Sequence, residues 1–255
     1  MELFYRQLGE GPPLIISHGL FGISDNWLNI GKHLSKHFTV YILDNRNHGL
    51  SPHSSEWNYD VMAEDIKELL DKIDTQKAIL IGHSMGGKIC MRFAEIYPER
   101  LDKLIVVDIS PRYYEPHHHT VLEALSAVNF DIIKTRKDAE QILRMFIKEE
   151  ATIQFILKNI YWKDNGKLSF RFNYEVISDN IENVGEACFE FGICTVPTLF
   201  IRGSKSNYIT NADIDDIHQK FTDVNCISIE NAGHWVHADK PLEFIKSVEE
   251  YLLKF

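Results

Sequence analysis

The sequence predicts an α/β protein with a mostly parallel central sheet flanked by helices. Short apolar runs alternate with longer amphipathic stretches, which is the pattern of strands and helices that builds such a sheet. The pattern breaks once, over residues 111–195, and resumes at Pro197. With 255 residues, 44% hydrophobic and 25% charged, the chain is long enough to bury a large core.

In the first half, each short apolar run is expected to form a buried strand. These strands are predicted at residues 14–17, 38–43, 77–82 and 103–108. The amphipathic stretches between them predict helices at 25–36, 59–73 and 85–96. Strand, helix and strand therefore alternate as far as Asp108.

Residues 111–195 are expected to form a mostly helical cap, inserted after the strand that ends at Asp108. Its expected parts are helices at 120–128, 137–149 and 152–161, a hairpin around Asn165-Gly166, and a strand at 168–172. The core would then consist of residues 1–110 and 196–255. Its second part is predicted to contain strands at 198–201 and 225–229 and helices at 212–221 and 242–253.

Composition and charge exclude several classes of partner. The net charge of −10 argues against nucleic acid or an anionic membrane surface, so a small-molecule substrate is expected. No apolar run reaches the roughly 18 to 20 residues of a membrane helix. The first residues lack the features of a signal peptide, so the expected compartment is the cytoplasm. The four cysteines show no C-x-x-C spacing and are predicted to be buried thiols. No pattern indicates an oligomeric state.

The strongest catalytic motif is Gly82-His83-Ser84-Met85-Gly86, which fits G-x-S-x-G. An apolar strand leads into it and an amphipathic helix leaves it, so the chain must turn sharply at Ser84. This turn would lift the Ser84 hydroxyl above the carboxyl edge of the sheet, beside the amino terminus of the next helix. Ser84 is therefore the predicted nucleophile.

The loop His18-Gly19-Leu20-Phe21-Gly22 follows the first predicted strand and reaches the same edge. We expect the backbone N–H groups of Leu20 and Met85 to form an oxyanion hole, with Phe21 as the alternative donor from the loop. His18 precedes Ser84 in the chain and is expected to form hydrogen bonds within the loop rather than to act as the base.

These motifs resemble the α/β-hydrolase superfamily. The resemblance extends over both ends of the chain, and within the superfamily it is closest to the YbfF-type bacterial esterases, which have a small helical cap. It rests on residues 18–22, Arg46-Asn47-His48-Gly49-Leu50-Ser51, the G-H-S-M-G-G run at 82–87, and Gly233-His234-Trp235-Val236-His237-Ala238. The resemblance implies hydrolysis of short or medium acyl esters and thioesters, with no cofactor and no metal.

His234 is the predicted base, because it follows the last strand and a glycine that lets the loop reach the sheet edge. Its position also fits the chain order of serine, acid and histidine in this fold. His237 is the alternative and is expected to line the mouth of the site. The run His117-His118-His119 is expected to consist of solvated loop histidines, since no carboxylate or cysteine beside it has metal-ligand spacing.

The acid has more than one candidate. The turn that commonly carries it reads Gly203-Ser204-Lys205-Ser206, and a serine cannot supply the negative charge. Asp108 emerges from an apolar strand at the same edge and is the predicted acid. The rivals Asp213, Asp215 and Asp216 start a later helix, where capping explains Asp213. The resemblance supports Asp108, because YbfF-type esterases pair an aspartate at this strand end with a serine at the later turn, which makes Ser206 an accessory residue.

Other residues near this edge have predicted binding or structural roles. Phe21, His48, Trp235 and His237 are expected to bind the substrate, with His48 and Trp235 as walls of the acyl pocket. Asp44 is expected to be structural, in a turn that contains an ion pair with Arg46.

The predicted activity is hydrolysis of a carboxylic ester or thioester through an acyl-serine intermediate. An acyl-CoA is included because cations cluster in the first half of the insertion, at Arg112, Lys134, Arg136, Lys137, Arg144 and Lys148. The same triad would also serve a C–C hydrolase, an amidase or a cofactor-free peroxidase. A relative that binds a ligand without turnover is the alternative from another class.

Overall fold

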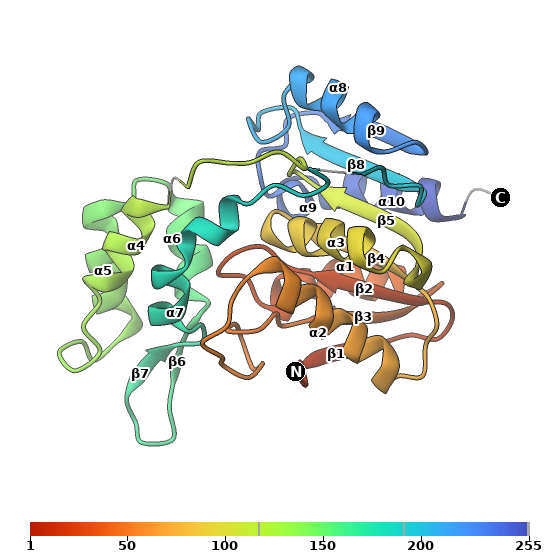
Figure 1. Ribbon diagram of the computed structural model, residues 1–255. Helices are drawn as coiled ribbons and strands as arrows, with labels where there is room; N and C mark the ends of the chain where they lie inside the picture. Colours follow the sequence, from red (N-terminus) through yellow and green to blue (C-terminus); the bar gives the residue numbers. More distant parts are fainter. Residues whose placement is uncertain (117, 191, 254–255) are drawn as a thin grey trace.

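Seven strands form one mostly parallel sheet in the computed structural model, which describes residues 1–116, 118–190 and 192–253 (Figure 1). β1 pairs with β3 in the antiparallel direction, and all other neighbours in the sheet are parallel. The order across the sheet is β1 (Tyr5–Leu8), β3 (Thr39–Leu43), β2 (Pro13–Ser17), β4 (Ala78–His83), β5 (Leu101–Val107), β8 (Thr198–Gly203) and β9 (Val224–Ile229). The predicted fold class is confirmed.

Helices cover both faces of the sheet because side chains alternate along each strand. Leu14 and Ile16 pack with α1 (Leu28–Leu34) and α10 (Pro241–Leu253) on one face. Ile15 belongs to the core on the other face, where the helices are α2 (Tyr59–Lys72), α3 (Met85–Ile96) and α8 (Asn211–Lys220). The nucleophile motif lies between β4 and α3, in the middle of this arrangement.

The local sequence explains α2 and β4. Asn58 caps α2, since its side chain accepts the Val61 N–H at 3.0 Å, and such a cap is worth about 1 kcal/mol. Met62, Ile66 and Leu69 are buried on one face of this helix. Every residue of β4 is buried, as expected for a central strand of a parallel sheet.

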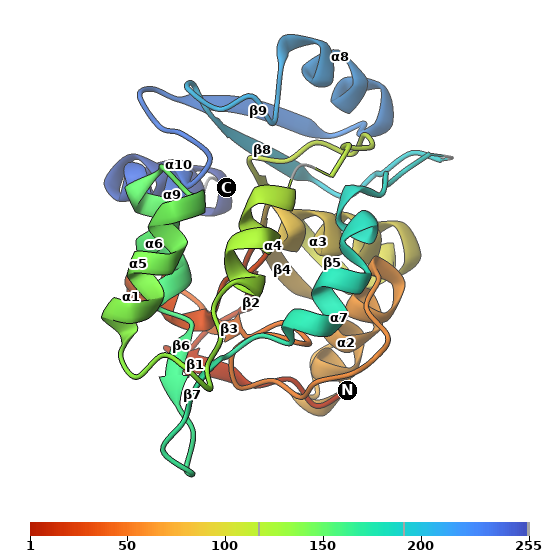
Figure 2. The same ribbon diagram turned by 90° about the vertical axis from the view of Figure 1, so that its left-hand side faces the viewer.

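The segment between β5 and β8 forms a separate group of elements beyond the carboxyl ends of the strands (Figures 1 and 2). It contains α4 (His119–Ser126), α5 (Arg136–Phe146), α6 (Glu150–Leu157), the hairpin of β6 (Ile160–Trp162) and β7 (Leu168–Phe170), α7 (Tyr174–Asp179) and the 3-10 helix η3 (Ile181–Gly185). We call residues 111–195 the insertion.

Several elements differ from the sequence predictions. The helix expected at 152–161 ends at Leu157, because residues 160–162 pair with β7 instead. β1, α7 and the short helix α9 (Val236–Asp239) were not predicted. Three of the four cysteines are buried free thiols, whereas Cys226 is partly exposed. Within the described ranges, no helix is both long enough and apolar enough to cross a membrane.

Candidate active site

Ser84 lies in a strained turn between β4 and α3. Its backbone has φ 53° and ψ −120°, a conformation that costs a non-glycine residue of order 1–3 kcal/mol. The Ser84 N–H donates to the Val107 carbonyl at 3.0 Å, which ties the turn to the end of β5. A Cβ atom on Gly82 would lie 2.2 Å from the Gly86 carbonyl oxygen, so the first glycine of the motif is required for this turn. The strained turn predicted for G-x-S-x-G is present.

Asp108 and His234 form a hydrogen-bonded pair beside this turn. The distance from His234 Nδ1 to Asp108 Oδ2 is 2.7 Å, and Asp108 is fully buried. Because Nδ1–H donates to the carboxylate, Nε2 of the imidazole is left unprotonated and able to accept a proton. Asp108 itself has φ 52°, so two residues at this edge hold strained backbone.

The end of β8 and the turn that follows it each supply a further donor to Asp108. The Gly203 N–H donates to Oδ1 at 3.0 Å, and the Ser206 hydroxyl donates to Oδ2, the oxygen that also accepts His234. With these bonds, the buried carboxylate has donors on both oxygens. Ser206 therefore contacts Asp108 directly, and its accessory role stays a prediction.

The loop after β2 presents one free candidate donor to the site. The Phe21 N–H donates to His48 Nε2 at 3.2 Å, so Phe21 cannot also serve an oxyanion, and this alternative is wrong. Leu20 lines the same cavity as Ser84. Met85 is the first residue of α3, where a helix leaves N–H groups without an internal acceptor. Leu20 and Met85 remain the predicted donors to an oxyanion.

A cavity of about 260 Å³ opens in front of Ser84 and His234. Leu20 lines it, and so do Phe21, Trp235 and His237, three of the four residues predicted to bind the substrate. The insertion contributes further lining residues: His118, Val121, Thr152, Phe155 and Ile156. Among the lining residues that the structure describes, none is Lys, Arg, Asp or Glu. This cavity suits an uncharged, apolar group.

Comparisons with known proteins show the family of this fold. A family model described as the alpha/beta hydrolase fold matches residues 12–131. Esterase YbfF of Escherichia coli is 36% identical, over 94% of this chain and 92% of that protein. The chain belongs to the α/β-hydrolase family. The sn-1-specific diacylglycerol lipase ABHD11 of Danio rerio is 40% identical over 96% of this chain and 79% of that protein. A solved structure described as a marine microorganism esterase superposes with a TM-score of 0.96 at 40% identity, covering 98% of this chain and 99% of its own.

In this α/β hydrolase, His48 does not line the cavity, and its predicted role as a wall of the acyl pocket is wrong. The side chain is fully buried, and Nδ1–H donates to the Arg46 carbonyl at 2.9 Å. Burial lowers the pKa of His48 to about 3, so the ring stays neutral and Nε2 accepts the Phe21 N–H. His48 thus helps to fix the conformation of the loop after β2.

His18 has the structural role expected for it. Its Nε2 accepts the Asn45 N–H at 3.0 Å, and Nδ1–H donates to the Gly19 carbonyl at 2.8 Å. Burial lowers the pKa of His18 to about 4, which keeps the ring neutral. His18 therefore joins the loop after β2 to the loop after β3.

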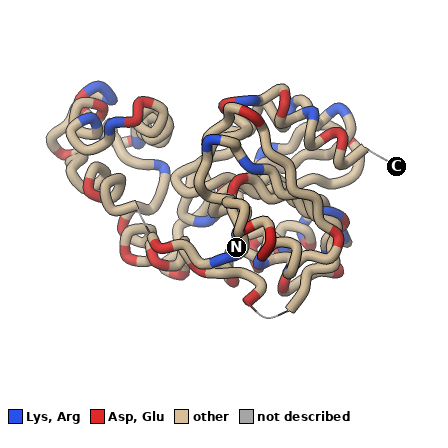
Figure 3. Tube along the Cα trace, turned by 90° about the horizontal axis from the view of Figure 1, so that it is seen from above, with Lys and Arg blue, Asp and Glu red and all other residues tan. Residues whose placement is uncertain are grey.

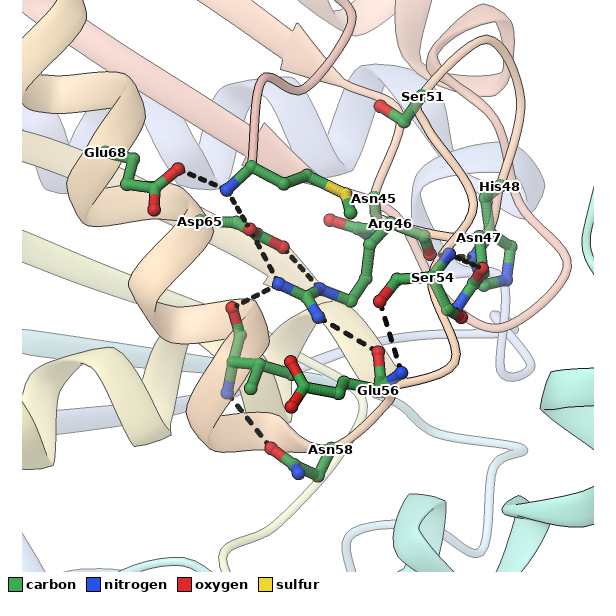
Figure 4. Close-up of polar contacts among 12 residues, drawn as sticks. Asn45, Arg46, Asn47, His48, Ser51, Ser54, Glu56, Asn58, Asp65 and Glu68 are labelled. Atoms are coloured by element: carbon green, nitrogen blue, oxygen red, sulfur yellow. Dashed lines mark hydrogen bonds and ion pairs between the residues drawn. The ribbon is translucent and has the colours of Figure 1, made fainter.

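Asp44 is structural, as expected, but its predicted ion pair with Arg46 is wrong. Figure 4 shows the Arg46 guanidinium directed at Asp65 of α2, with Nε to Oδ2 at 2.6 Å and Nη2 to Oδ1 at 2.8 Å. The Asp44 carboxylate instead accepts the backbone N–H groups of Ser24 at 2.6 Å and Leu50 at 2.8 Å. Arg46 can form two parallel hydrogen bonds to Asp65, because the planar guanidinium matches the geometry of a carboxylate.

The rivals for base and acid have other partners. His237 stacks on Trp27 with ring centroids 3.9 Å apart, and burial lowers its pKa to about 3. The carboxylate partner belongs to His234. Asp213 forms a capping box with Thr210 at the start of α8 and pairs with Arg112 at 2.6 Å. Both residues therefore have structural roles in this fold.

The run His117-His118-His119 was expected to consist of solvated loop histidines, and the outcome differs for each residue. His118 is partly buried and lines the cavity, so the prediction of a solvated loop residue is wrong for it. His119 is exposed at the start of α4. His117 lies outside the described residues.

Sequence reasoning missed three residues that position the site. The Tyr208 ring stacks on His234 at a centroid distance of 3.9 Å. His83 Nε2–H donates to the His234 carbonyl at 2.8 Å, so the loop of the base is tied to the nucleophile turn. Asn159 of the insertion donates to the Phe21 carbonyl at 2.7 Å. His83 lies within the motif and Tyr208 close to Ser206, so these two had a local signal, whereas Asn159 had none.

Proposed function

We propose that this α/β hydrolase cleaves carboxylic esters with short or medium acyl chains, using Ser84 as nucleophile, His234 as base and Asp108 as acid. The observation that carries the proposal is the bond from His234 Nδ1 to Asp108 Oδ2 at 2.7 Å, beside a cavity that both Ser84 and His234 line. This arrangement supports activation of Ser84 by His234 and leaves room for the acyl group in the shared cavity.

In the first half of the reaction, Ser84 Oγ attacks the ester carbonyl while His234 Nε2 takes its proton. The buried Asp108 carboxylate stabilises the imidazolium that forms. The N–H groups of Leu20 and Met85 donate to the oxyanion of the tetrahedral intermediate. His234 then protonates the leaving alcohol, the C–O bond breaks, and the acyl group stays on Ser84. Water, activated by the same imidazole, releases the acid.

The acyl group would occupy the cavity of about 260 Å³. Because the insertion supplies Val121 and Phe155 to this cavity, the insertion would act as the cap that limits the acyl chain. The zebrafish relative is named a diacylglycerol lipase, so acylglycerols belong in the substrate panel together with simple esters. The cytoplasmic location expected from the sequence stays a prediction.

A fluorophosphonate probe should form a covalent adduct on Ser84. Its phosphorus bonds to Ser84 Oγ, fluoride leaves, and His234 accepts the proton, so the reaction requires an activated serine. Intact-protein mass spectrometry should find one adduct, and peptide mapping should place it at Ser84. The Ser84→Ala variant is the control and should remain unlabelled. A wild-type protein without an adduct would favour the binding-protein alternative.

A thioester of coenzyme A is a second candidate, and one observation favours it. A second depression is lined by Arg112, Lys205 and His234, so two cations lie beside the proposed base. The insertion's other cations, beyond Arg112, are less suitable. Figure 3 shows acidic residues among them, Arg144 pairs with Glu140 and Glu150, and Arg136 Nη2 donates to the Ile160 carbonyl.

Salt should separate the two substrate classes. If Arg112 and Lys205 attract phosphate groups, kcat/KM for acetyl-CoA should fall between about 0.01 and 0.5 M salt, as the Debye length shrinks from roughly 30 Å to under 8 Å. Neutral p-nitrophenyl acetate should be nearly unaffected. Lys205→Glu should reproduce the high-salt behaviour at low salt. Equal salt dependence for both substrates, or no turnover of the thioester, would exclude this candidate and leave the esterase.

A further inference from the structure

Lys88 is a fully buried lysine that the proposed mechanism does not use. It lies in the first turn of α3, where its N–H donates to the Ser84 carbonyl at 3.1 Å. Its side chain runs through the core, and its Nζ donates to the carbonyls of Pro111 at 3.1 Å, Arg112 at 2.6 Å and Glu186 at 2.7 Å. An ammonium has three donors, and three uncharged backbone acceptors satisfy them.

These three carbonyls belong to the two segments through which the insertion joins the core. We call residues 111–114 and 185–188 the stem: the first carries the chain out of the core and the second brings it back (Figure 1). The two segments also bind each other, because the Tyr114 N–H donates to the Gly185 carbonyl at 2.8 Å and the Cys188 N–H to the Pro111 carbonyl at 2.8 Å. Lys88 thus connects both halves of the stem to the helix that carries the nucleophile turn.

The stem is linked to the proposed base through Tyr208, and it leads into one wall of the acyl cavity. The Tyr114 hydroxyl donates to the carbonyl of Tyr208, whose ring stacks on His234 at 3.9 Å. α4 follows the outgoing segment and supplies Val121 to the cavity wall. The far side of the insertion is attached separately, through Asn159 to the Phe21 carbonyl. We therefore expect a change in the stem to shift the wall formed by α4, while the contact between Asn159 and the loop after β2 remains.

We propose that Lys88 is a positioning residue that fixes the stem of the insertion, and through it determines which acyl chain lengths the cavity accepts. The inference rests on the proposed function, because it concerns the acyl side of the same site. Burying an ammonium group among neutral carbonyls costs free energy unless each of its N–H groups has an acceptor. All three acceptors of Lys88 are carbonyls of the stem. In agreement, burial lowers the pKa of Lys88 to about 8.

The test compares two esters that differ only in their acyl chain, p-nitrophenyl acetate and p-nitrophenyl hexanoate. The longer hexanoyl group is expected to depend more on the wall formed by the insertion than the acetyl group does. In Lys88→Met, kcat/KM for the hexanoate should fall by about tenfold or more, chiefly through KM, and for the acetate by no more than about threefold. Lys88→Gln retains two donors and should restore part of the loss. Lys77→Met, which replaces an exposed lysine, is the matched control.

Hydrogen exchange gives a readout that does not depend on activity. Amides of residues 111–114 and 185–188 should exchange faster in Lys88→Met than in the wild type, while those of β4 should be unchanged. Gly185→Ala is a second route to the same state, because its Cβ would lie 2.1 Å from the Tyr114 carbonyl oxygen and would separate the two segments. It should produce the same selective loss on the hexanoate, even if Lys88→Met fails to fold.

The outcomes separate this inference from the proposed function. Equal losses on both esters, or unchanged kinetics with unchanged exchange in the stem, would overturn the role of Lys88. If the wild-type protein cleaves neither ester and does not react with a fluorophosphonate, the proposed function fails. In that case, unchanged exchange in Lys88→Met would also overturn the structural part of the inference.

Discussion

Replacing Ser84 or His234 by alanine should lower kcat for ester hydrolysis by roughly 10³- to 10⁶-fold. Ser84→Ala removes the atom that attacks the carbonyl. His234→Ala removes the group that takes its proton, and it leaves the buried Asp108 carboxylate without one of its donors. Steady-state hydrolysis of p-nitrophenyl acetate measures both effects.

The double variant Ser84→Ala/His234→Ala should be hardly worse than either single variant. Because Ser84 and His234 act in the same step, loss of either one already removes the contribution of the pair to kcat. The second substitution therefore has little further effect. His53→Ala, which replaces an exposed histidine, is the matched control, and circular dichroism checks the fold. Losses that multiply in the double variant would mean that Ser84 and His234 act independently, which contradicts the proposed mechanism.

The core was predictable because buried strands and amphipathic helices leave a local pattern in the sequence. α3 has the predicted bounds, and β2, β3, β4, β5, β8 and β9 all appear within a few residues of the predicted ranges. β1 was missed because it is a short edge strand that contains Arg6 and Gln7, so it lacks the apolar run of a central strand. β9 lies at the other edge of the sheet, but its apolar residues Cys226, Ile227 and Ile229 still made it recognisable.

The insertion was harder to predict because its elements depend on contacts with one another. The apolar run through Ile153 and Ile160 looks like one helix, but residues 160–162 pair with β7 across a turn in which Gly166 has φ 75°. A short apolar run fits a helix or a strand equally well, and here the distant partner decides. The same dependence on distant partners hid the contact from Asn159 to Phe21.

The site itself divides in the same way. Ser84, Asp108 and His234 each follow a strand, so topology alone brings them to one edge of the sheet. The partners of His48 and Arg46 depend on which way their side chains turn inside the core. His48 contacts the Phe21 N–H and Arg46 contacts Asp65. Neither partner can be predicted from the neighbouring sequence.

Among the acidic candidates, Asp108→Asn should have the largest effect, with kcat lowered by on the order of 10²- to 10⁴-fold. Asparagine keeps the shape of the side chain but removes the charge opposite the imidazolium, and it favours the wrong tautomer of His234. Asp213→Asn should change kcat little, because Asp213 caps α8 and pairs with Arg112 instead of contacting His234. Both variants are measured with p-nitrophenyl acetate, and a larger loss in Asp213→Asn would move the acid to that residue.

Ser206→Ala then tests how much the hydrogen bond from Ser206 to Asp108 contributes to activity. The Ser206 hydroxyl and His234 both donate to Oδ2, whereas Oδ1 accepts the Gly203 N–H. Removing one donor of three leaves the carboxylate buried, so kcat should fall by no more than about tenfold, with Ser55→Ala, at an exposed serine, as the control. A loss as large as that of Asp108→Asn would make Ser206 a full member of the catalytic group, because the aspartate alone would then be unable to orient the imidazole.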